Sequence, residues 1–338
     1  MAVTIRDLAK MLKISSGTAS MALNNRPGVN PKTRQRVIEL AKELGYTGST
    51  AKPKSIEAGT IAFVVYKRHG VVVADTQFFT ELTQSIENAA RKRGYAVTLL
   101  YCAGTAQTEN TLETIRKARL QGLLLLGTEM TVEDFEPFKK AKLPTMLLDC
   151  NLIDCGADRV LINNTEGIRQ AISYLYSCSH RKIGYLHSLV SIQNFEERAM
   201  GYRQAMLEFD LKPDRLFLLE PTVEGACRDM EQQLKEEKSV PPALIADNDL
   251  IAFGAMKALK KSGYQIPGDV SIIGFDNVPA CILMEPELTS IDVHASTLGE
   301  TAVWQLIQRI KEPKTPFLKL EVGTTLCERH SVRPFAET

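Results

Sequence analysis

The 338-residue chain lacks the features that mark several common classes of protein. No run approaches the ~20 consecutive apolar residues of a membrane-spanning helix, and no signal peptide precedes the first predicted helix. The seven cysteines include no Cys-x-x-Cys pair, and the five histidines show no zinc-ligand spacing. We therefore expect a cytoplasmic protein with reduced, mostly buried thiols and no metal site.

Motifs of the common hydrolases and nucleotide-binding enzymes are also missing. The chain contains no Gly-x-Ser-x-Gly, no Gly-Lys-Ser/Thr phosphate loop and no His-Glu-x-x-His. We expect no enzymatic activity and no cofactor. A sugar-processing enzyme is the alternative, and it would turn over a bound ligand.

The net charge of +1 conceals an uneven distribution of charge. Residues 1–54 hold ten Lys or Arg against three acids, whereas the remainder holds 31 basic and 37 acidic residues. A basic module attached to an acidic body is suited to binding a phosphate backbone, although a solvated helical surface is the simpler alternative. The length indicates two or three domains, and a content of 44% hydrophobic and 24% charged residues is ordinary for a globular protein.

The first 46 residues predict three short helices that pack together. Thr4 is an N-cap candidate, Ser15 can cap a second helix after a turn, and Asn30 with Pro31 begins a third. Apolar residues at helical spacing give each helix a buried face: Ile5, Leu8, Ala9 and Leu12; then Ala19, Ala22 and Leu23; then Val37, Ile38, Leu40, Ala41 and Leu44, with Gly45 as C-cap. Two short helices joined by a tight turn are typical of a helix-turn-helix, whose second helix enters the DNA major groove.

From residue 60 onward, apolar strands alternate with helices. Strands are predicted at 60–66, 96–101, 122–126, 144–149, 182–187, 216–219, 243–246 and 270–275, and helices at 79–94, 110–120, 168–178, 196–209, 225–236 and 249–262. Because the strands are apolar on both faces, they indicate parallel sheets that are covered on both sides. We expect an all-α helix-turn-helix headpiece plus an α/β body of two open parallel-sheet lobes, with ligands beyond the carboxyl ends of the strands.

Residues 4–46 resemble the headpiece of the LacI/GalR (lactose-repressor) family of transcription regulators. The combined pattern is Thr4-Ile-x-Asp7-Leu-Ala9, Ser15-x-x-Thr18-x-Ser20-x-x-Leu23-Asn24, Val29-x-x-x-Thr33-Arg34-x-x-Val37 and Leu44-Gly45-Tyr46. Later motifs extend the resemblance: Arg181-Lys-Ile-Gly184-Tyr, Arg198-x-x-Gly201-Tyr, Asn248-Asp249-x-x-Ala252-x-Gly254-Ala255, Gly274-Phe275-Asp276-Asn277, Leu298-Gly299 and Arg329-x-Ser331. The resemblance implies a body similar to periplasmic sugar-binding proteins, which binds a small effector.

The resemblance also implies the division of the chain. It gives a headpiece at 1–46, a linker or hinge at 47–59, a first lobe at 60–159 with 291–319, and a second lobe at 160–290 with 320–338. Family members usually carry a hinge helix that starts with Pro-Asn and includes a Leu entering the minor groove. Here Gly48-Ser49 replaces Pro-Asn, Pro53 interrupts the segment and Ser55 replaces the Leu, so the sequence leaves the hinge helix undecided.

The positions that match the family's DNA contacts are rich in short hydroxyl side chains. They are Thr4, Ser15, Ser16, Gly17, Thr18, Ser20, Met21, Asn24, Asn30, Thr33 and Tyr46. Hydroxyls suit phosphate oxygens, and the base-reading positions would be Ser16, Gly17 and Met21. Met21 offers apolar contact, for instance with a thymine methyl group, or it is simply a partly buried side chain.

Six residues of the body are candidates for effector binding. The resemblance places an effector-binding Arg at Arg198, and the carboxyl ends of strands present Asp149, Asn248 and Asp276. Phe78 and Phe79 can form an aromatic wall, or at least one of them belongs to the core. The basic run Lys67-Arg68-His69 after the first strand suggests a phosphorylated or acidic effector, with a solvated loop as the alternative.

These expectations combine into a DNA-binding transcription regulator, a repressor, that responds to a sugar, sugar phosphate or related effector. The resemblance implies a homodimer on a palindromic operator, because one headpiece reads only a half-site. No heptad repeat follows Arg329, so a tetramer held by a C-terminal coiled coil is not expected. A solute-binding protein without a DNA role is the rival from another class.

Overall fold

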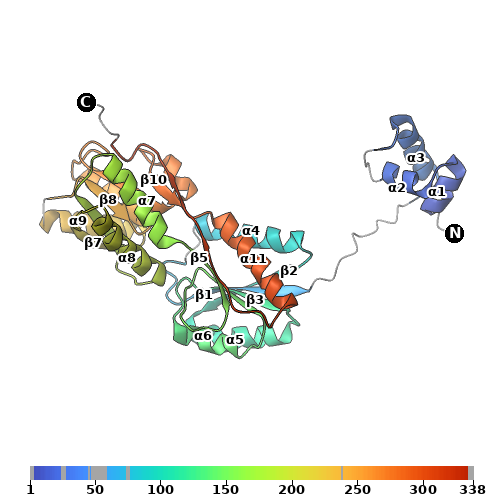
Figure 1. Cartoon of the computed structure of the whole chain (residues 1–338), viewed down its shortest axis with the longest axis horizontal. Helices are drawn as coiled ribbons and strands as arrows, with labels where there is room; N and C mark the ends of the chain where they lie inside the picture. Colours follow the sequence, from blue (N-terminus) through green and yellow to red (C-terminus); the bar gives the residue numbers. More distant parts are fainter. Residues whose placement is uncertain are drawn as a thin grey trace. The chain divides into compact units, whose positions relative to one another are not determined.

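A computed structural model describes residues 4–23, 28–44, 46, 59–73, 77–236 and 239–333, in two units, Met1–Ala58 and Gly59–Thr338 (Figure 1). The linker with Gly48, Pro53 and Ser55 lies outside the described residues, as do Asn24 and Gly45. Among the helices that the structure describes, none is long and apolar enough to cross a membrane.

The first unit contains three helices: α1 (Ile5–Leu12), α2 (Ser16–Leu23) and α3 (Pro31–Glu43). The predicted caps are confirmed. Thr4 and Asp7 form a reciprocal capping box, the Ser15 hydroxyl accepts the Thr18 N–H at 3.0 Å, and the Asn30 side chain accepts the Lys32 N–H at 2.9 Å. The turn between α1 and α2 is tight because Lys13 adopts a left-handed conformation, with φ of 53°.

A small core joins these three helices. Leu8, Ala19, Ala22 and Val37 are fully buried, with Ala9 and Ala41 almost so. Ile38 was expected on the buried face, but the structure places it 37% exposed on α3. Val37 and Ala41 are the buried residues of this helix, so the prediction for Ile38 is wrong.

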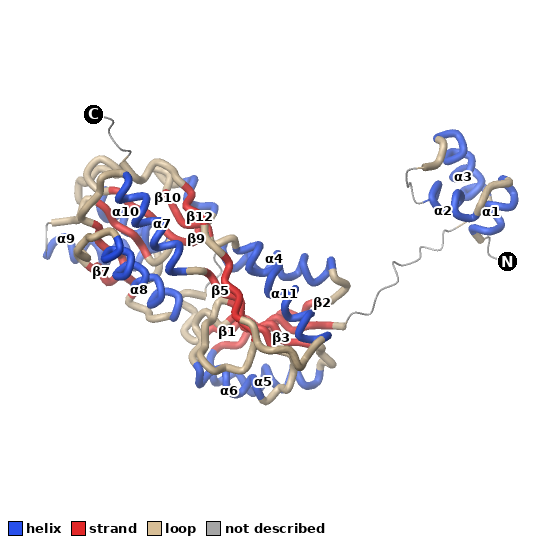
Figure 2. The backbone as a smooth tube through the Cα atoms, viewed as in Figure 1, coloured by secondary structure: helices blue, strands red, loops and turns tan. Residues whose placement is uncertain are grey.

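The second unit is built on two six-stranded sheets (Figure 2). The first sheet has the order β11-β5-β4-β3-β1-β2, and all its strands are parallel. Its strands are β1 (Thr60–Lys67), β2 (Ala96–Ala103), β3 (Gly122–Leu126), β4 (Thr145–Leu148), β5 (Asp158–Ile162) and β11 (Lys319–Val322). Helices α4 (Gln77–Lys92) and α11 (Ala295–Lys311) cover one face, and α5 (Gly104–Lys117) and α6 (Val132–Lys139) cover the other (Figure 1).

The second sheet has the order β12-β10-β9-β8-β6-β7, with only β12 antiparallel to its neighbour. Its strands are β6 (Ile183–Ser188), β7 (Leu216–Leu219), β8 (Ala243–Ala246), β9 (Ser271–Asp276), β10 (Thr289–Asp292) and β12 (Thr325–Cys327). Helix α7 (Asn164–Ser177) packs with α8 (Gln193–Glu208), and α9 (Val223–Glu236) packs with α10 (Asp249–Lys261). The predicted fold class is confirmed.

Successive side chains of a strand point to opposite faces of the sheet, so each strand contributes to the hydrophobic core on both faces. In β1, Ile61, Phe63 and Val65 belong to the cluster that includes α4, whereas Ala62 and Val64 pack toward α5 and α6. Both faces of the strand are therefore buried, as its continuous apolar sequence requires. The seven cysteines are free thiols, six of them buried and Cys327 partly exposed.

The chain crosses between the two sheets three times. The crossings follow β5, β10 and β11, which end at Ile162, Asp292 and Val322. The expected lobe boundaries, 159/160, 290/291 and 319/320, fall inside these strands. The sequence interpretation did not identify the three strands, because polar residues such as Asp158, Ser290 and Glu321 interrupt their apolar runs.

Candidate functional site

A cavity of about 310 Å³ opens at the carboxyl ends of the strands, with lining residues from both lobes. All six predicted effector-binding residues line it. The lining residues are Val72, Gln77, Phe78, Phe79, Thr128, Asp149, Ile162, Ile192, Asn194, Phe195, Arg198, Asn248, Asp249, Leu250, Asp276, Val278 and Ala280. Its volume falls within the range of small-molecule sites.

Arg198 provides the only cationic side chain among the lining residues. It is 2% exposed on α8, so it is not an ordinary surface arginine. Its Nε donates to Asn164 Oδ1 at 2.9 Å, and an Nη1 hydrogen bond reaches the Asp247 carbonyl. Its guanidinium carbon lies 3.8 Å from the centroid of the Phe275 ring, which fixes the plane of the guanidinium.

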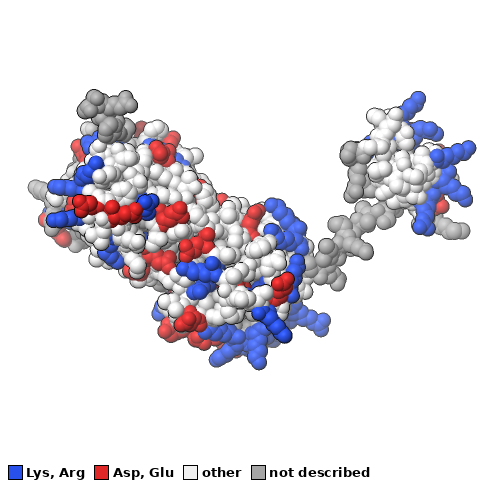
Figure 3. Space-filling view, in the orientation of Figure 1, with Lys and Arg blue, Asp and Glu red and all other residues white. Residues whose placement is uncertain are grey.

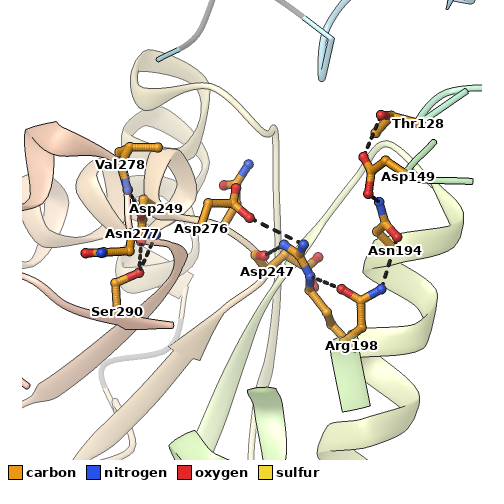
Figure 4. A network of polar contacts seen from close by, with 12 residues as sticks. Thr128, Asp149, Asn194, Arg198, Asp247, Asp249, Asp276, Asn277, Val278 and Ser290 are labelled. Atoms are coloured by element: carbon orange, nitrogen blue, oxygen red, sulfur yellow. Dashed lines mark hydrogen bonds and ion pairs between the residues drawn. The ribbon is translucent and has the colours of Figure 1, made fainter. Parts of the chain in front are cut away.

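Asp276 stands at the end of β9 and faces this guanidinium. Its Oδ1 lies 3.3 Å from Arg198 Nη2 (Figure 4). Burial raises the pKa of Asp276 to about 8, although the positive charge of Arg198 acts in the opposite direction. Asp276 has a φ of 104°, a left-handed conformation that non-glycine residues rarely adopt.

Asp149 directly follows β4 and repeats this arrangement in the first lobe. It also has a positive φ, 58°, and it accepts hydrogen bonds from Thr128 Oγ1 at 2.6 Å and Asn194 Nδ2 at 2.8 Å. Burial raises its pKa to about 6 despite these bonds. Asn194 stands one helical turn before Arg198 on α8, so this helix presents both an amide and a guanidinium to the cavity (Figure 4).

Asp249 contributes mainly by holding the loop that follows Asp276. It accepts the Ser290 hydroxyl at 2.6 Å, the Val278 N–H at 2.8 Å and the Cys281 thiol at 3.2 Å. Burial raises its pKa to about 6. The neighbouring Asn248 caps α10 through the Ile251 N–H at 2.9 Å.

The basic run after β1 does not reach the cavity. Lys67 lies over the Tyr101 ring, Arg68 is 3.9 Å from Asp134, and His69 is 3.2 Å from Glu129. Glu129 also accepts four backbone N–H groups from the loop at 69–73, which outweigh its burial and lower its pKa. The run therefore shapes this loop, and the argument for a phosphorylated or acidic effector from these residues is wrong.

The candidate DNA-contact residues divide by exposure. Thr4, Ser15, Ser16, Gly17 and Asn30 are exposed, and Thr18, Ser20, Met21, Thr33 and Tyr46 are half-buried. An added Cβ at Gly17 would meet only the Ser15 hydroxyl, at 3.6 Å, so the start of α2 presents open backbone. Met21 packs in part against the headpiece, as its alternative interpretation held.

Comparisons with known proteins cover both units. The family model for bacterial regulatory proteins of the lacI family matches residues 4–49. The model for periplasmic binding proteins and the sugar binding domain of the LacI family matches residues 60–324. The chain belongs to the LacI family.

Similar proteins of this family match along the whole chain. The HTH-type transcriptional repressor PurR of Mannheimia succiniciproducens is 30% identical, with 98% of this chain and 99% of that protein covered. The ribose operon repressor of Haemophilus influenzae is 29% identical, with 97% and 98% covered. The cellobiose complex of the transcriptional regulator CelR has a TM-score of 0.72 at 25% identity, with 97% and 99% covered.

This LacI-family chain is thus a transcription regulator with a helix-turn-helix DNA-binding domain and an effector-binding body. Sequence reasoning missed several lining residues of the body: Val72, Gln77, Thr128, Ile162, Ile192, Asn194, Phe195, Asp249, Leu250, Val278 and Ala280. Two had a usable signal, because Asn194 is four residues before Arg198 on one helix and Asp249 follows Asn248. Thr128 had none, since its place depends on the turn after β3.

Proposed function

We propose that the chain is a repressor that binds operator DNA as a homodimer. Its affinity for the operator changes when a neutral sugar-like effector occupies the cavity. The observation that carries this proposal is the convergence of Arg198, Asp276, Asp149, Asn248 and two phenylalanines on one cavity in a chain with a DNA-binding headpiece. Because operator DNA lies inside the cell, we place its activity in the cytoplasm.

The charges of the cavity favour a neutral ligand. Three carboxyl groups, of Asp149, Asp249 and Asp276, line the cavity together with a single guanidinium, that of Arg198. A phosphate group would meet carboxylates without a second cation to compensate, which disfavours sugar phosphates. Hydroxyl groups of a sugar can instead donate to Asp276 and accept from Arg198 and Asn248, while Phe78 and Phe79 cover the apolar face of the ring.

In the headpiece we propose that α2 enters the major groove by its first turn. The exposed hydroxyls of Ser15 and Ser16 suit phosphate oxygens and base edges, and Gly17 allows the backbone to approach DNA closely. Thr4, Thr18, Ser20, Met21, Asn24, Asn30, Thr33 and Tyr46 complete the proposed contact set.

A thermal-shift screen tests the effector site. The purified protein is screened against ribose, cellobiose, their phosphates and nucleobases, in parallel with Asp276→Asn and with Asp214→Asn, an exposed carboxylate away from the cavity, as the matched control. We expect a neutral sugar to raise the melting temperature of the parent and of Asp214→Asn but not of Asp276→Asn. A sugar phosphate that shifts the parent more than its neutral form would contradict the proposed ligand class.

Two further measurements separate this function from its rivals. Light scattering is expected to give twice the 37.5 kDa mass of the chain, as a homodimer requires. Turnover of the bound ligand would favour an enzyme, and ligand binding without any DNA binding would favour a solute-binding protein.

A further inference from the structure

One edge of the first lobe collects the ends of four helices. Because β1 to β5 and β11 are all parallel, the helices that connect them run back across the sheet and end where the next strand begins. Helices α4, α5, α6 and α11 therefore end at the same edge, at the starts of β2, β3, β4 and β11. The start of β1, Thr60, lies at this edge as well, so the headpiece is joined to the body there.

This edge is strongly basic, although the body as a whole is acidic. We call residues 91–96, 116–122, 139–145 and 311–319 the first-lobe rim; they include twelve Lys or Arg and one acid, Glu312. The segment before β5 brings one more exposed acid, Asp154, close to Lys139 and Lys142. The basic residues are all exposed: Arg91, Lys92, Arg93, Arg116, Lys117, Arg119, Lys139, Lys140, Lys142, Lys311, Lys314 and Lys319. Figure 3 shows Lys and Arg side chains gathered over the side of this lobe where β1 begins.

Helix capping does not account for this charge. A basic residue in the last turn complements the helix dipole, but one residue is enough and the second lobe has the same topology without such an excess. The corresponding segments there, 177–183, 207–216, 234–243 and 260–271, hold eight basic and six acidic residues. Helices α7 and α8 have no basic residue in the last turn at all.

Part of the rim charge is paired only weakly. Lys92, Arg116, Lys117, Lys139 and Lys319 each lie within ion-pair distance of a glutamate, but the partners are mostly exposed and such pairs contribute little. Among the described residues, no carboxylate pairs with Arg119, Lys140, Lys142, Lys311 or Lys314. These five side chains keep their full charge for an external anion.

We propose that the first-lobe rim binds the phosphate backbone of the DNA that flanks the operator, as a second electrostatic contact of the same chain. This inference rests on the proposed function. Tyr46 and Gly59 can lie at most about 45 Å apart along the chain, so the body stays tethered to a headpiece that holds DNA. Exposed Lys and Arg at the ends of helices suit phosphates rather than bases, so the contact adds affinity without sequence preference.

Salt dependence of DNA binding by the full chain tests the proposal. A duplex is first selected with the parent protein from a pool with a random core of about 20 base pairs, the span of two half-sites. Binding is then measured between low and moderate NaCl on the selected core alone and on the core with long flanks. The rim variant removes five positive charges through Arg119→Gln, Lys140→Gln, Lys142→Gln, Lys311→Gln and Lys314→Gln. The matched control removes five positive charges from exposed residues of the second lobe, through Lys182→Gln, Arg203→Gln, Lys212→Gln, Lys235→Gln and Lys257→Gln.

We expect the parent and the control to bind the flanked duplex more tightly than the core, and the rim variant to lose this gain. For about three lost phosphate contacts, the slope of log affinity against log salt falls by about 2.7 on the flanked duplex. An unchanged flank gain in the rim variant, or an equal loss in the control, overturns the proposal. If the parent selects no duplex at all, the proposed DNA-binding function itself fails, which is a distinct result.

Discussion

Two aspartates at the carboxyl ends of strands have a backbone conformation with positive φ. Asp149 and Asp276 both have positive φ, and both side chains line the cavity. Such conformations cost free energy and persist where the surrounding structure fixes them, as the Thr128, Asn194 and Arg198 contacts do here. Their positions were predictable because parallel strands deliver side chains to one edge. Their backbone strain was not, because it depends on contacts from other elements.

The stability of the protein should depend on pH through Asp276. Its pKa rises from 3.8 to about 8 on folding, so the folded state holds a proton that the unfolded state has lost. The free energy of unfolding should therefore fall as pH rises. Asp149 and Asp249 ionise near pH 6, so between about pH 6 and 8 the fall comes mainly from Asp276 among these three carboxyl groups.

We expect Asp276→Asn to show a shallower fall than the parent between pH 6 and 8 in urea unfolding. His187, whose pKa the Asp247 side chain raises, acts in the same direction but is common to both proteins. Parallel curves for parent and variant over this range would show that Asp276 is not protonated in the folded state.

A glycine in β9 is required by the close approach of Asp249. A Cβ at Gly274 would lie 2.1 Å from Asp249 Oδ1, and that carboxylate is fixed by Ser290, Val278 and Cys281. We expect Gly274→Ala to lower the free energy of unfolding by about 2 kcal/mol. In the double variant with Asp249→Ala the shortest clash is gone and only Leu288 Cδ2, at 2.8 Å, remains close, so the combined cost should be smaller than the sum of the two. Additive costs would contradict the steric explanation.

At the scale of the elements, apolar runs and caps were the reliable signals. The strands β3, β7 and β8 begin and end where the sequence predicted, and the caps Thr4, Ser15 and Asn30 act as expected. Predicted helices of the body mostly begin two to six residues late. Strands β5, β10, β11 and β12 were missed because polar or charged residues interrupt their apolar runs, and their pairing depends on chain segments far away in the sequence.

The first turn of α2 offers a test of the proposed major-groove element. A Cβ at Gly17 meets no backbone, so Gly17→Ala should leave the headpiece folded and raise its helix stability by up to about 1 kcal/mol. The added methyl group would occupy the space that we assign to DNA. We expect roughly ten-fold weaker binding to the parent's selected duplex.

Met11→Ala is the matched control for this variant. Met11 is 62% exposed on α1, which we do not place in the groove, and the substitution leaves the charge unchanged. Circular dichroism checks folding, and fluorescence anisotropy measures DNA affinity. Unchanged affinity for Gly17→Ala would remove this turn from the proposed DNA contact.

At the scale of the whole molecule, charge and ligand chemistry are separated within one lobe. The carboxyl ends of the first-sheet strands present Glu129 and Asp149 near the cavity, whereas the opposite edge is the basic first-lobe rim. Composition alone showed an acidic body, because a count of charged residues adds the cavity edge and the basic rim together. The topology of the sheet was needed to assign each charge to its edge.

The account requires that the cavity and the headpiece are coupled, and one measurement tests this most directly. DNA affinity is measured with and without the sugar found by thermal shift, and sugar affinity is measured with and without the selected duplex, for the parent and for Asp276→Asn. Coupling is reciprocal, so we expect both affinities of the parent to change by the same factor, of about 5 to 150, and neither to change in the variant. A sugar that binds the cavity while DNA affinity stays the same would contradict the account.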